Sequence, residues 1–362
     1  MATITRAEAY LVDVEVETVR TDAVQSFVKQ ETIFVEVGTD DGLTGTGYAF
    51  TIGTGGSSVL ALLRDHLLPR LAGQDAARIE AVWRDLFGAT RSTTVGVLTS
   101  LAVAAVDTAL WDLRCLRADA PLWIVAGGAK PRVPLYDTEG GWLHLPVDDL
   151  VAGAKVAQAA GWLGVKLKIG KPDGREDAER VAAVRDAVGA GLEIMVDANQ
   201  SLTAAEARRR AAMLEPLDVA WFEEPLPPDD VTGHVEVVRS TTLPVAVGES
   251  LYSIGQFAEY LRRGAAGIVQ PDAARVGGIT PWLKIAHLAE AMNVAVCPHF
   301  LMELHVSLAA AIPNGRYVER IPQLRAITVG ELEVVDGHAV APSTPGLGIA
   351  WNRDAIEDRR VA

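Results

Sequence analysis

Three acidic residues recur at a single spacing, and each follows a short apolar run. Asp197 ends Glu-Ile-Met-Val-Asp, Glu223 follows Val-Ala-Trp-Phe, and Glu249 follows Pro-Val-Ala-Val-Gly. Asp197 and Glu223 are 26 residues apart, as are Glu223 and Glu249. Apolar runs separated by amphipathic segments indicate alternating strands and helices, so each interval is one βα unit. Because a parallel barrel places the C-termini of its strands on one rim, we expect the three carboxylates to converge there.

Three converging carboxylates repel one another unless a positive group lies among them. A set of oxygen donors suits Mg²⁺, with Mn²⁺ as an alternative, better than it suits zinc. For any one acid alone, a helix cap or an ion pair with arginine is an equally good interpretation. Because the three share one spacing, we predict that Asp197, Glu223 and Glu249 are metal ligands.

From Arg132 onward, short apolar runs alternate with helical segments. This pattern predicts an α/β fold, a modified (β/α)7β TIM-type barrel in which the eighth helix is weak or missing because Pro322 follows the last run closely. The eight expected strands are Val133–Tyr136, Gly164–Ile169, Leu192–Val196, Val219–Phe222, Val245–Val247, Gly267–Gln270, Val294–Cys297 and Arg316–Val318.

The residues before the barrel have a different pattern. Ile4 to Phe50 alternates like an antiparallel meander with a turn at Asp40-Asp41-Gly42, and residues 57–72, 77–88 and 96–118 have helical periodicity. We therefore expect an α+β capping domain at 1–127 and the barrel at 128–327. A C-terminal segment at 328–362 is expected to return to the capping domain.

Bulk composition narrows the class of partner. A net charge of −14 argues against nucleic acid and anionic membranes, which attract basic proteins, but leaves small acids open as substrates. Two cysteines give no disulfide framework, and the N-terminus has no apolar signal core. We expect a cytoplasmic protein.

Two lysines lie on the second expected barrel strand, Val165-Lys166-Leu167-Lys168-Ile169. Strand alternation puts Lys166 and Lys168 on one face, directed into the barrel mouth. Crowding and desolvation favour a neutral amine on one of them, which would supply a general base. The alternative is a salt bridge from either lysine to a buried acid.

The sixth and seventh strands end at Asp272 and His299. Since these strands are adjacent, the carboxylate can hold one ring nitrogen while the other accepts a proton from a bound molecule. A histidine that follows a strand can equally be a structural residue. The metal and the lysines expected nearby favour the catalytic pair.

Two further polar residues are expected at the rim. Glu319 ends the eighth strand and, if protonated, could donate a hydrogen bond to a developing oxyanion; an ion pair with Arg320 or Arg325 is the alternative. Asn199 follows Asp197 by two residues and could position a substrate oxygen. Glu224 is expected to support the site rather than bind the metal.

These residue types define a reaction class. A metal flanked by a lysine and a His-Asp pair suits removal of the weakly acidic proton α to a carboxylate, which gives an enediolate. Reprotonation would racemise or epimerise the acid, elimination of a β-hydroxyl would dehydrate it, and expulsion of a ring oxygen would open a cyclic acid. A Schiff-base aldolase is the alternative from another class, but it leaves the three acids unused.

Motifs across nearly the whole chain point to one family. They are Ala109-Leu110-Trp111-Asp112, Lys166-x-Lys168, Met195-Val-Asp197-Ala-Asn199-Gln-Ser201, Trp221-Phe-Glu-Glu224-Pro225, Gly248-Glu249, Pro271-Asp272, Gly277-Gly278-Ile279-Thr280, His299 and Glu319. This set resembles the mandelate racemase subgroup of the enolase superfamily, the mandelate racemase/muconate lactonizing enzyme family. That superfamily uses a Lys or His base with Mg²⁺ on an enediolate.

The resemblance implies a role for each motif. It implies Mg²⁺ on the three spaced acids, Lys168 as one base, and His299 with Asp272 as the other. It also implies that loops Thr18–Gln30 and Thr51–Ser57 cover and select the substrate; the covering residues that we expect are Arg20, Thr21, Asp22, Tyr48 and Thr51. Relatives in this family form dimers or octamers, so the resemblance also implies a homo-oligomer.

Departures from the family pattern bear on the substrate. Ser250 stands where many relatives have Asn, and Cys297-Pro298 precedes His299, so the pocket is no copy of mandelate racemase. The loop Thr18–Ser26 is polar, which favours a polyhydroxylated acid. We therefore expect dehydration of an aldonate or aldarate to a 2-keto-3-deoxy acid. A racemase, epimerase or cycloisomerase of a 2-hydroxy or anhydro-sugar acid is the alternative.

Overall fold

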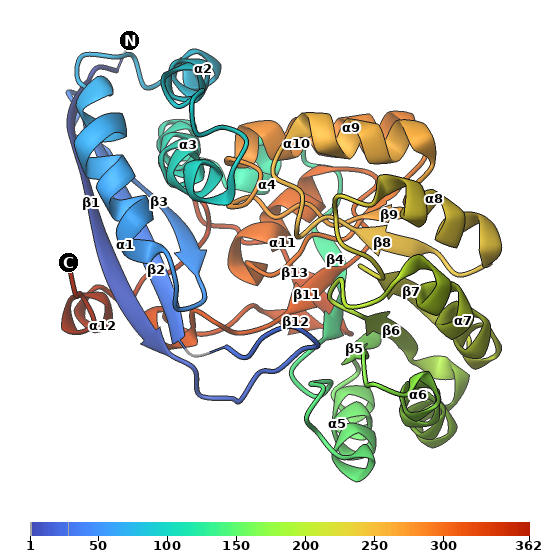
Figure 1. The fold of residues 1–362 in the computed structure, drawn as a ribbon. Helices are drawn as coiled ribbons and strands as arrows, with labels where there is room; N and C mark the ends of the chain where they lie inside the picture. Colours follow the sequence, from blue (N-terminus) through green and yellow to red (C-terminus); the bar gives the residue numbers. More distant parts are fainter. Residues whose placement is uncertain (1, 28) are drawn as a thin grey trace.

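The structure is a computed structural model that describes residues 2–27 and 29–362. Met1, at the start of the expected capping domain, and Val28, in the expected covering loop, lie outside the described residues. An antiparallel sheet with its helices lies beside a barrel whose strands are surrounded by helices (Figure 1). Among the described residues, no helix combines the length and apolar character needed to cross a bilayer.

The capping sheet is the meander expected from the sequence. Strands β1 (Ile4–Glu15), β2 (Lys29–Thr39) and β3 (Thr44–Thr51) pair antiparallel in that order. Helix α3 (Val97–Arg117) packs so closely on β3 that a Cβ at Gly47 would lie 2.0 Å from the Ala105 carbonyl oxygen. The other helical segments of this part are α1 (Gly56–Leu62), η1 (Leu63–Leu67), η2 (Leu68–Arg70), α2 (Ile79–Ala89) and α4 (Leu122–Val125).

Eight parallel strands form the barrel, as expected. They are β4 (Arg132–Asp137), β5 (Gly164–Lys168), β6 (Glu193–Asp197), β7 (Val219–Glu223), β8 (Val245–Val247), β9 (Ile268–Val269), β10 (Ala295–Val296) and β11 (Val318–Arg320). Strand β11 pairs with β4, and a bridge between Val296 and Gly315 joins β10 to the segment that enters β11. The predicted fold class is confirmed.

Helices cover the outside of the barrel, and apolar side chains fill its interior. The helices are α5 (Val147–Ala159), α6 (Gly174–Val188), α7 (Ala204–Leu214), α8 (Val231–Ser240), α9 (Ile254–Arg263), α10 (Ile279–Ala291) and α11 (Met302–Ala311), with short turns η3 (Gly189–Gly191) and η4 (Glu215–Leu217). After β11 there is a single 3-10 turn, η5 (Arg325–Ile327), so the eighth helix is reduced as expected. The interior cluster contains Tyr136, Met195, Trp221, Ala246, Ile268, Cys297 and Tyr317.

The C-terminal segment returns to the capping sheet. After β12 (Val334–Val335) and β13 (His338–Val340), which extend the barrel sheet beside β4, it reaches α12 (Arg353–Asp358) next to β1 (Figure 1). Trp351 packs edge-on against Phe34 and Tyr48, with ring centroids 4.9 and 5.3 Å apart. The division at residues 127 and 327 stays a prediction.

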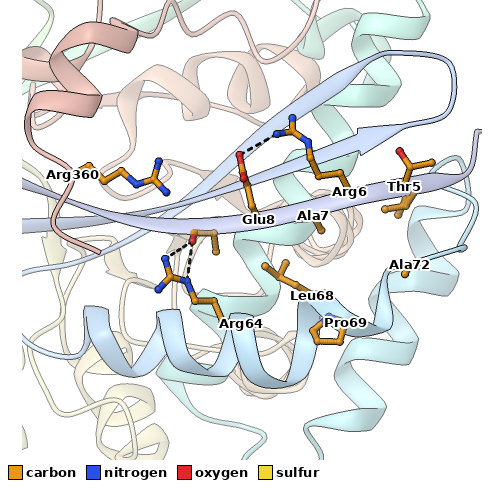
Figure 2. A pocket seen from close by; sticks show the side chains of 11 residues that line it. Thr5, Arg6, Ala7, Glu8, Arg64, Leu68, Pro69, Ala72 and Arg360 are labelled. Carbon is orange, nitrogen blue, oxygen red and sulfur yellow. Dashed lines mark hydrogen bonds and ion pairs between the residues drawn. The ribbon is translucent and has the colours of Figure 1, made fainter.

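A surface groove lies away from the barrel rim. It measures about 500 Å³ and runs between the N-terminal half of β1 and the segment η1–η2 (Figure 2). Three of its charged groups are already engaged: Arg6 pairs with Glu8, and Arg64 donates to the Ala9 carbonyl. None of the predicted site residues lines it.

Candidate active site

The predicted polar residues gather in a small cavity at the C-terminal ends of the barrel strands. Barrel residues and capping residues line it together, namely Asp22, Gln25, Phe27, Phe50, Trp142, Lys166, Lys168, Asn199, Glu249, Arg275, His299, Phe300, Glu319 and Ile321. A second cavity of about 290 Å³ shares Gln25, Phe50, Asn199, Glu249 and Arg275 with it. The site is therefore closed by the capping domain, and the second cavity extends it.

The three spaced acids converge as expected. Asp197 ends β6, Glu223 ends β7, and Glu249 follows β8; one oxygen from each lies within 4.8 Å of the others. All three are buried. Gly248 holds a left-handed φ of 157°, and a Cβ there would lie 2.5 Å from the backbone of Gln270, so only glycine brings Glu249 to this position.

Both lysines point into this group of acids. Lys166 Nζ lies 2.9 Å from Glu223 Oε1 and 2.7 Å from Glu319 Oε1. Lys168 Nζ lies 2.5 Å from Asp197 Oδ2. The alternative considered for each lysine, a salt bridge to a buried acid, is therefore present in the structure.

The charge state of the lysines differs from the expected neutral amine. Burial lowers the pKa of Lys166, but Glu223 and Glu319 outweigh it and raise that pKa well above its ordinary value. For Lys168 burial also opposes the charge, and Asp197 raises the pKa above its usual value. That expectation considered repulsion between the lysines and not the acids around them, which favour the charged form. An aldolase would also leave the three converging acids without a role.

Carboxylates remain in excess over cationic groups here. Glu319 and the three spaced acids face two lysines and Arg275, whose Nη1 lies 3.8 Å from Glu249 Oε1. Burial and the neighbouring Asp197 raise the pKa of Glu223 to about 7. Asn199 Oδ1 is also buried and has no hydrogen-bond partner among the described residues. This excess of oxygen donors fits a hard divalent cation.

His299 and Asp272 form the expected pair. His299 Nδ1 donates to Asp272 Oδ2 at 2.9 Å, and Asp272 Oδ1 accepts from the backbone N–H of Ala274 at 2.8 Å. His299 Nε2 faces Glu249 Oε2 at 3.4 Å. Burial lowers the pKa of His299, but Glu249 and the bond to Asp272 raise it above its ordinary value. The pair therefore borders the acidic group on the side of Glu249, whereas Lys168 borders it on the side of Asp197.

Glu319 holds neighbouring groups as an ionised carboxylate. Its Oε1 accepts from Thr138 Oγ1 at 2.7 Å, and its Oε2 accepts from the N–H of Phe300 at 2.9 Å. Burial opposes ionisation, but Lys166 outweighs it and lowers the pKa of Glu319. In this state Glu319 cannot donate the hydrogen bond that its protonated form would have supplied. The expected alternative partner Arg320 bonds Asp137 instead.

Two of the expected covering residues point away from the cavity. Arg20 donates to Glu139, with 2.9 Å from Nε to Oε1. Thr21 Oγ1 bonds His144 Nδ1 at 2.7 Å. These contacts tie the covering loop to the loop after β4, so both side chains hold the cover in place.

The other three covering residues occupy different places. Asp22 lines the cavity and accepts from the N–H groups of Val24 and Gln25, both at 2.8 Å. Thr51 lines the second cavity, but its hydroxyl donates to a carboxylate, Glu31. Tyr48 lies in strand β3 and is buried in the capping core, so it is not a loop residue.

Arg275 is the main cavity residue that the sequence analysis missed. Its Nη1 donates to the Glu249 carbonyl at 2.8 Å, and its guanidinium lies over the Phe50 ring at 5.9 Å. It follows Asp272 in the loop after β9. A basic residue in the loop after a barrel strand was the available signal, because barrel sites lie at this end of the strands.

Family comparisons agree with this geometry. Residues 4–127 match the mandelate racemase/muconate lactonizing enzyme N-terminal domain, and residues 149–355 match the enolase C-terminal domain-like family. The chain therefore belongs to the mandelate racemase/muconate lactonizing enzyme family of the enolase superfamily, and the resemblance inferred from the motifs is confirmed.

Individual relatives carry named activities. The chain is 37% identical to a 3,6-anhydro-α-L-galactonate cycloisomerase of Streptomyces coelicolor over 90% of each protein. It is 34% identical to the L-talarate/galactarate dehydratase of Salmonella typhimurium, covering 89% of this chain and 81% of that one. The structure of an L-talarate dehydratase from Polaromonas with Mg and L-glucarate superimposes with a TM-score of 0.96 at 36% identity, covering 100% of this chain and 98% of that one.

Proposed function

We propose that this enzyme removes the proton α to the carboxylate of a sugar acid and eliminates the oxygen on the β-carbon, which gives a 2-keto-3-deoxy acid. The observation that carries the proposal is the placement of two proton-transfer groups beside one acidic group. Lys168 contacts Asp197, and His299 faces Glu249. The named relatives support a sugar acid as the substrate.

Asp197, Glu223 and Glu249 would hold Mg²⁺, and the orphan oxygen of Asn199 is a further polar group beside them. When bound, Mg²⁺ supplies the positive charge that stabilises an enediolate. Its charge would also offset the field of the carboxylates around the lysines, so that Lys168 could serve as a base. Lys166 would stay near the substrate carboxylate as a counter-charge, held in place by its ion pair with Glu319.

Lys168 and His299 would act on opposite faces of the α-carbon. One of them takes the α-proton, and the other donates a proton to the departing oxygen or to the α-carbon. Asp272 keeps the proton of His299 on Nδ1, so Nε2 is the nitrogen that exchanges protons with the substrate. Closure by Phe27, Phe50 and the covering loop excludes water from the enediolate.

Dehydration is the leading reaction because polar groups line the substrate cavity. Asp22, Gln25, Asn199 and Arg275 can bind hydroxyl groups beyond the reacting carbons. Fewer residues of the covering loop support this choice than the sequence suggested, since Arg20 bonds Glu139 and Thr21 bonds His144. The cavity residues now support it.

A cycloisomerase of an anhydro-sugar acid is the second candidate. In a 3,6-anhydro acid the leaving oxygen on the β-carbon belongs to a ring ether, so the same residues would open the ring and give the same kind of product. Aromatic rings favour this substrate: Phe50 stacks on Phe300 at 4.7 Å, and Phe27 and Trp142 complete the wall. Such a wall suits the C–H face of a furanoid ring.

A substrate screen separates these proposals. The purified chain with Mg²⁺ is incubated with a library of aldonic, aldaric and 3,6-anhydro-aldonic acids, and 2-keto-3-deoxy products are followed by NMR. Product from open-chain acids supports dehydration, whereas product from anhydro acids alone supports the cycloisomerase. If no acid gives a product or exchanges its α-proton in D₂O, the proposed function is wrong.

We further propose that the enzyme acts in the cytoplasm as a homo-oligomer. The exposed apolar residue Val95, just before α3, supports contact with a second copy. Light scattering after size exclusion measures the assembly, and a monomeric mass contradicts this proposal.

A further inference from the structure

His305 contacts the residue that follows each member of the His299–Asp272 pair in the sequence. Its Nε2 accepts from the N–H of Ala273 at 3.1 Å, and its Nδ1 donates to the carbonyl of Phe300 at 3.3 Å. It sits in α11 and is fully buried. One imidazole therefore joins the rim loop after β9 to the rim loop after β10.

These two contacts define the state of the ring. A nitrogen that accepts from an amide carries no proton, so the proton is on Nδ1 and the ring is neutral. Burial lowers the pKa of His305 to about 4, which agrees with a neutral ring. His305 is therefore a fixed donor and a fixed acceptor, and it has no free nitrogen for proton transfer.

The loop on the His299 side needs such a tether. Phe300 and Leu301 hold left-handed φ angles of 59° and 26°, which are unfavourable for bulky residues. Glu319 Oε2 holds the N–H of Phe300 at 2.9 Å, and His305 holds its carbonyl. Both ends of this strained residue are anchored, so the preceding His299 has a defined position.

The loop on the Asp272 side is held in a similar way. Trp282 Nε1 donates to the carbonyl of Pro271 at 2.9 Å, and its ring stacks with that of His305 at 6.2 Å. The N–H of Ala273 is held by His305. The residues on either side of Asp272 are thus fixed by hydrogen bonds with Trp282 and His305.

We propose that His305 is a positioning residue that sets the distance and angle between His299 and Asp272 by binding both of their loops at once. This inference rests on the proposed function, in which that pair serves one face of the substrate. It assigns His305 no contact with the substrate. Loss of either tether would misplace His299 while leaving the lysine side unchanged.

Two substitutions separate the tethers. In His305→Asn the side-chain amide N–H can replace Nδ1 as donor to the Phe300 carbonyl, but the acceptor for the Ala273 N–H is lost. In His305→Gln the side-chain carbonyl can replace Nε2 as acceptor for the Ala273 N–H, but the donor to the Phe300 carbonyl is lost. Ser307→Ala is the matched control, because Ser307 lies in the same helix and its buried hydroxyl has no partner within residues 2–27 and 29–362. All three variants are first checked for folding by circular dichroism.

The first measurement is α-proton exchange in D₂O with Mg²⁺, using galactarate and its α-carbon epimer L-talarate. We expect exchange on the His299 face to fall by about 10- to 100-fold in both His305 variants, since a displacement of about 1 Å costs that much. Exchange on the Lys168 face and KM should change by less than about twofold. Equal losses on both faces, or no loss on either, would overturn the proposal.

The second measurement is independent of turnover. In protein with ¹⁵N-labelled histidine, the proton between His299 Nδ1 and Asp272 gives a downfield NMR resonance, identified by its absence in His299→Asn. We expect this resonance to shift or broaden in both His305 variants and to persist in Ser307→Ala. An unchanged resonance refutes the positioning role. If neither acid exchanges in the wild type, the proposed substrates are wrong, and this resonance still decides the role of His305.

Discussion

Replacing Glu303 by glutamine should stabilise the protein, and the gain should grow with pH. Glu303 is buried at the start of α11, and burial raises the pKa of its carboxyl from 4.5 to about 8. The folded chain therefore keeps this proton between these two pH values, whereas the unfolded chain releases it. Stability falls as pH rises through this window, because the folded state binds the extra proton. A glutamine does not ionise and escapes this loss.

The size of the effect follows from the shift in pKa. Each tenfold change in proton affinity is worth about 1.4 kcal/mol, so Glu303 costs about 1.4 kcal/mol near pH 5.5 and about 4 kcal/mol near pH 8. Gln323 Nε2 donates to Glu303 Oε2 at 3.3 Å and would donate to the glutamine oxygen too. An imperfectly paired amide N–H costs about 1 kcal/mol. The net gain for Glu303→Gln is then about zero near pH 5.5 and about 3 kcal/mol near pH 8.

Urea unfolding of both proteins, followed by fluorescence at about pH 5.5 and pH 8, measures this difference. Comparing the two proteins at each pH cancels the other titrating groups, including those at the metal site. Glu303→Asp is the control, since it keeps an ionisable carboxyl. A Glu303→Gln gain of the same size at both pH values would refute the reasoning, because Glu303 would then not be held neutral.

Three further variants test the metal site, the domain contact and the catalytic pair. Glu249→Gln should weaken Mg²⁺ binding by at least about 10- to 100-fold in calorimetry, and unchanged affinity would remove Glu249 from the ligand set. Gly278→Ala should destabilise the fold by about 1–3 kcal/mol in urea, because Gly278 has a φ of 117° and a Cβ there would lie 2.3 Å from Asp107 Oδ2; an unchanged midpoint would contradict this. Asp272→Asn should lower α-proton exchange on the His299 face by about 10²- to 10⁴-fold and leave the Lys168 face active, and equal losses would argue against two separate bases.

The barrel and its acidic group could be predicted because one spacing encodes both. A βα unit of constant length returns the chain to the same rim, so Asp197, Glu223 and Glu249 had to meet if the apolar runs were strands. Alternation within one strand placed Lys166 and Lys168 by the same kind of periodicity. Periodicity is a property of local sequence, and it needs no knowledge of distant contacts.

Charge states and loop contacts could not be predicted in this way. The lysines were expected to repel each other, but their pKa values depend on acids contributed by β6, β7 and β11. Arg20 was expected over the substrate, but Glu139 lies 119 residues further along the chain and binds it. Such contacts depend on how loops from two domains meet.

His305 lay beyond the reach of the sequence for a related physical reason. It stands in an apolar helix six residues after His299, where the pattern alone indicates a buried structural residue. Its contact with Phe300 exists because the chain reverses through left-handed φ angles at Phe300 and Leu301, which no residue propensity predicts for bulky side chains. The reversal brings the Phe300 carbonyl to Nδ1, while a different strand brings Ala273 to Nε2. The metal ligands and the two bases can therefore be found from spacing, whereas the residues that hold them in place depend on backbone geometry.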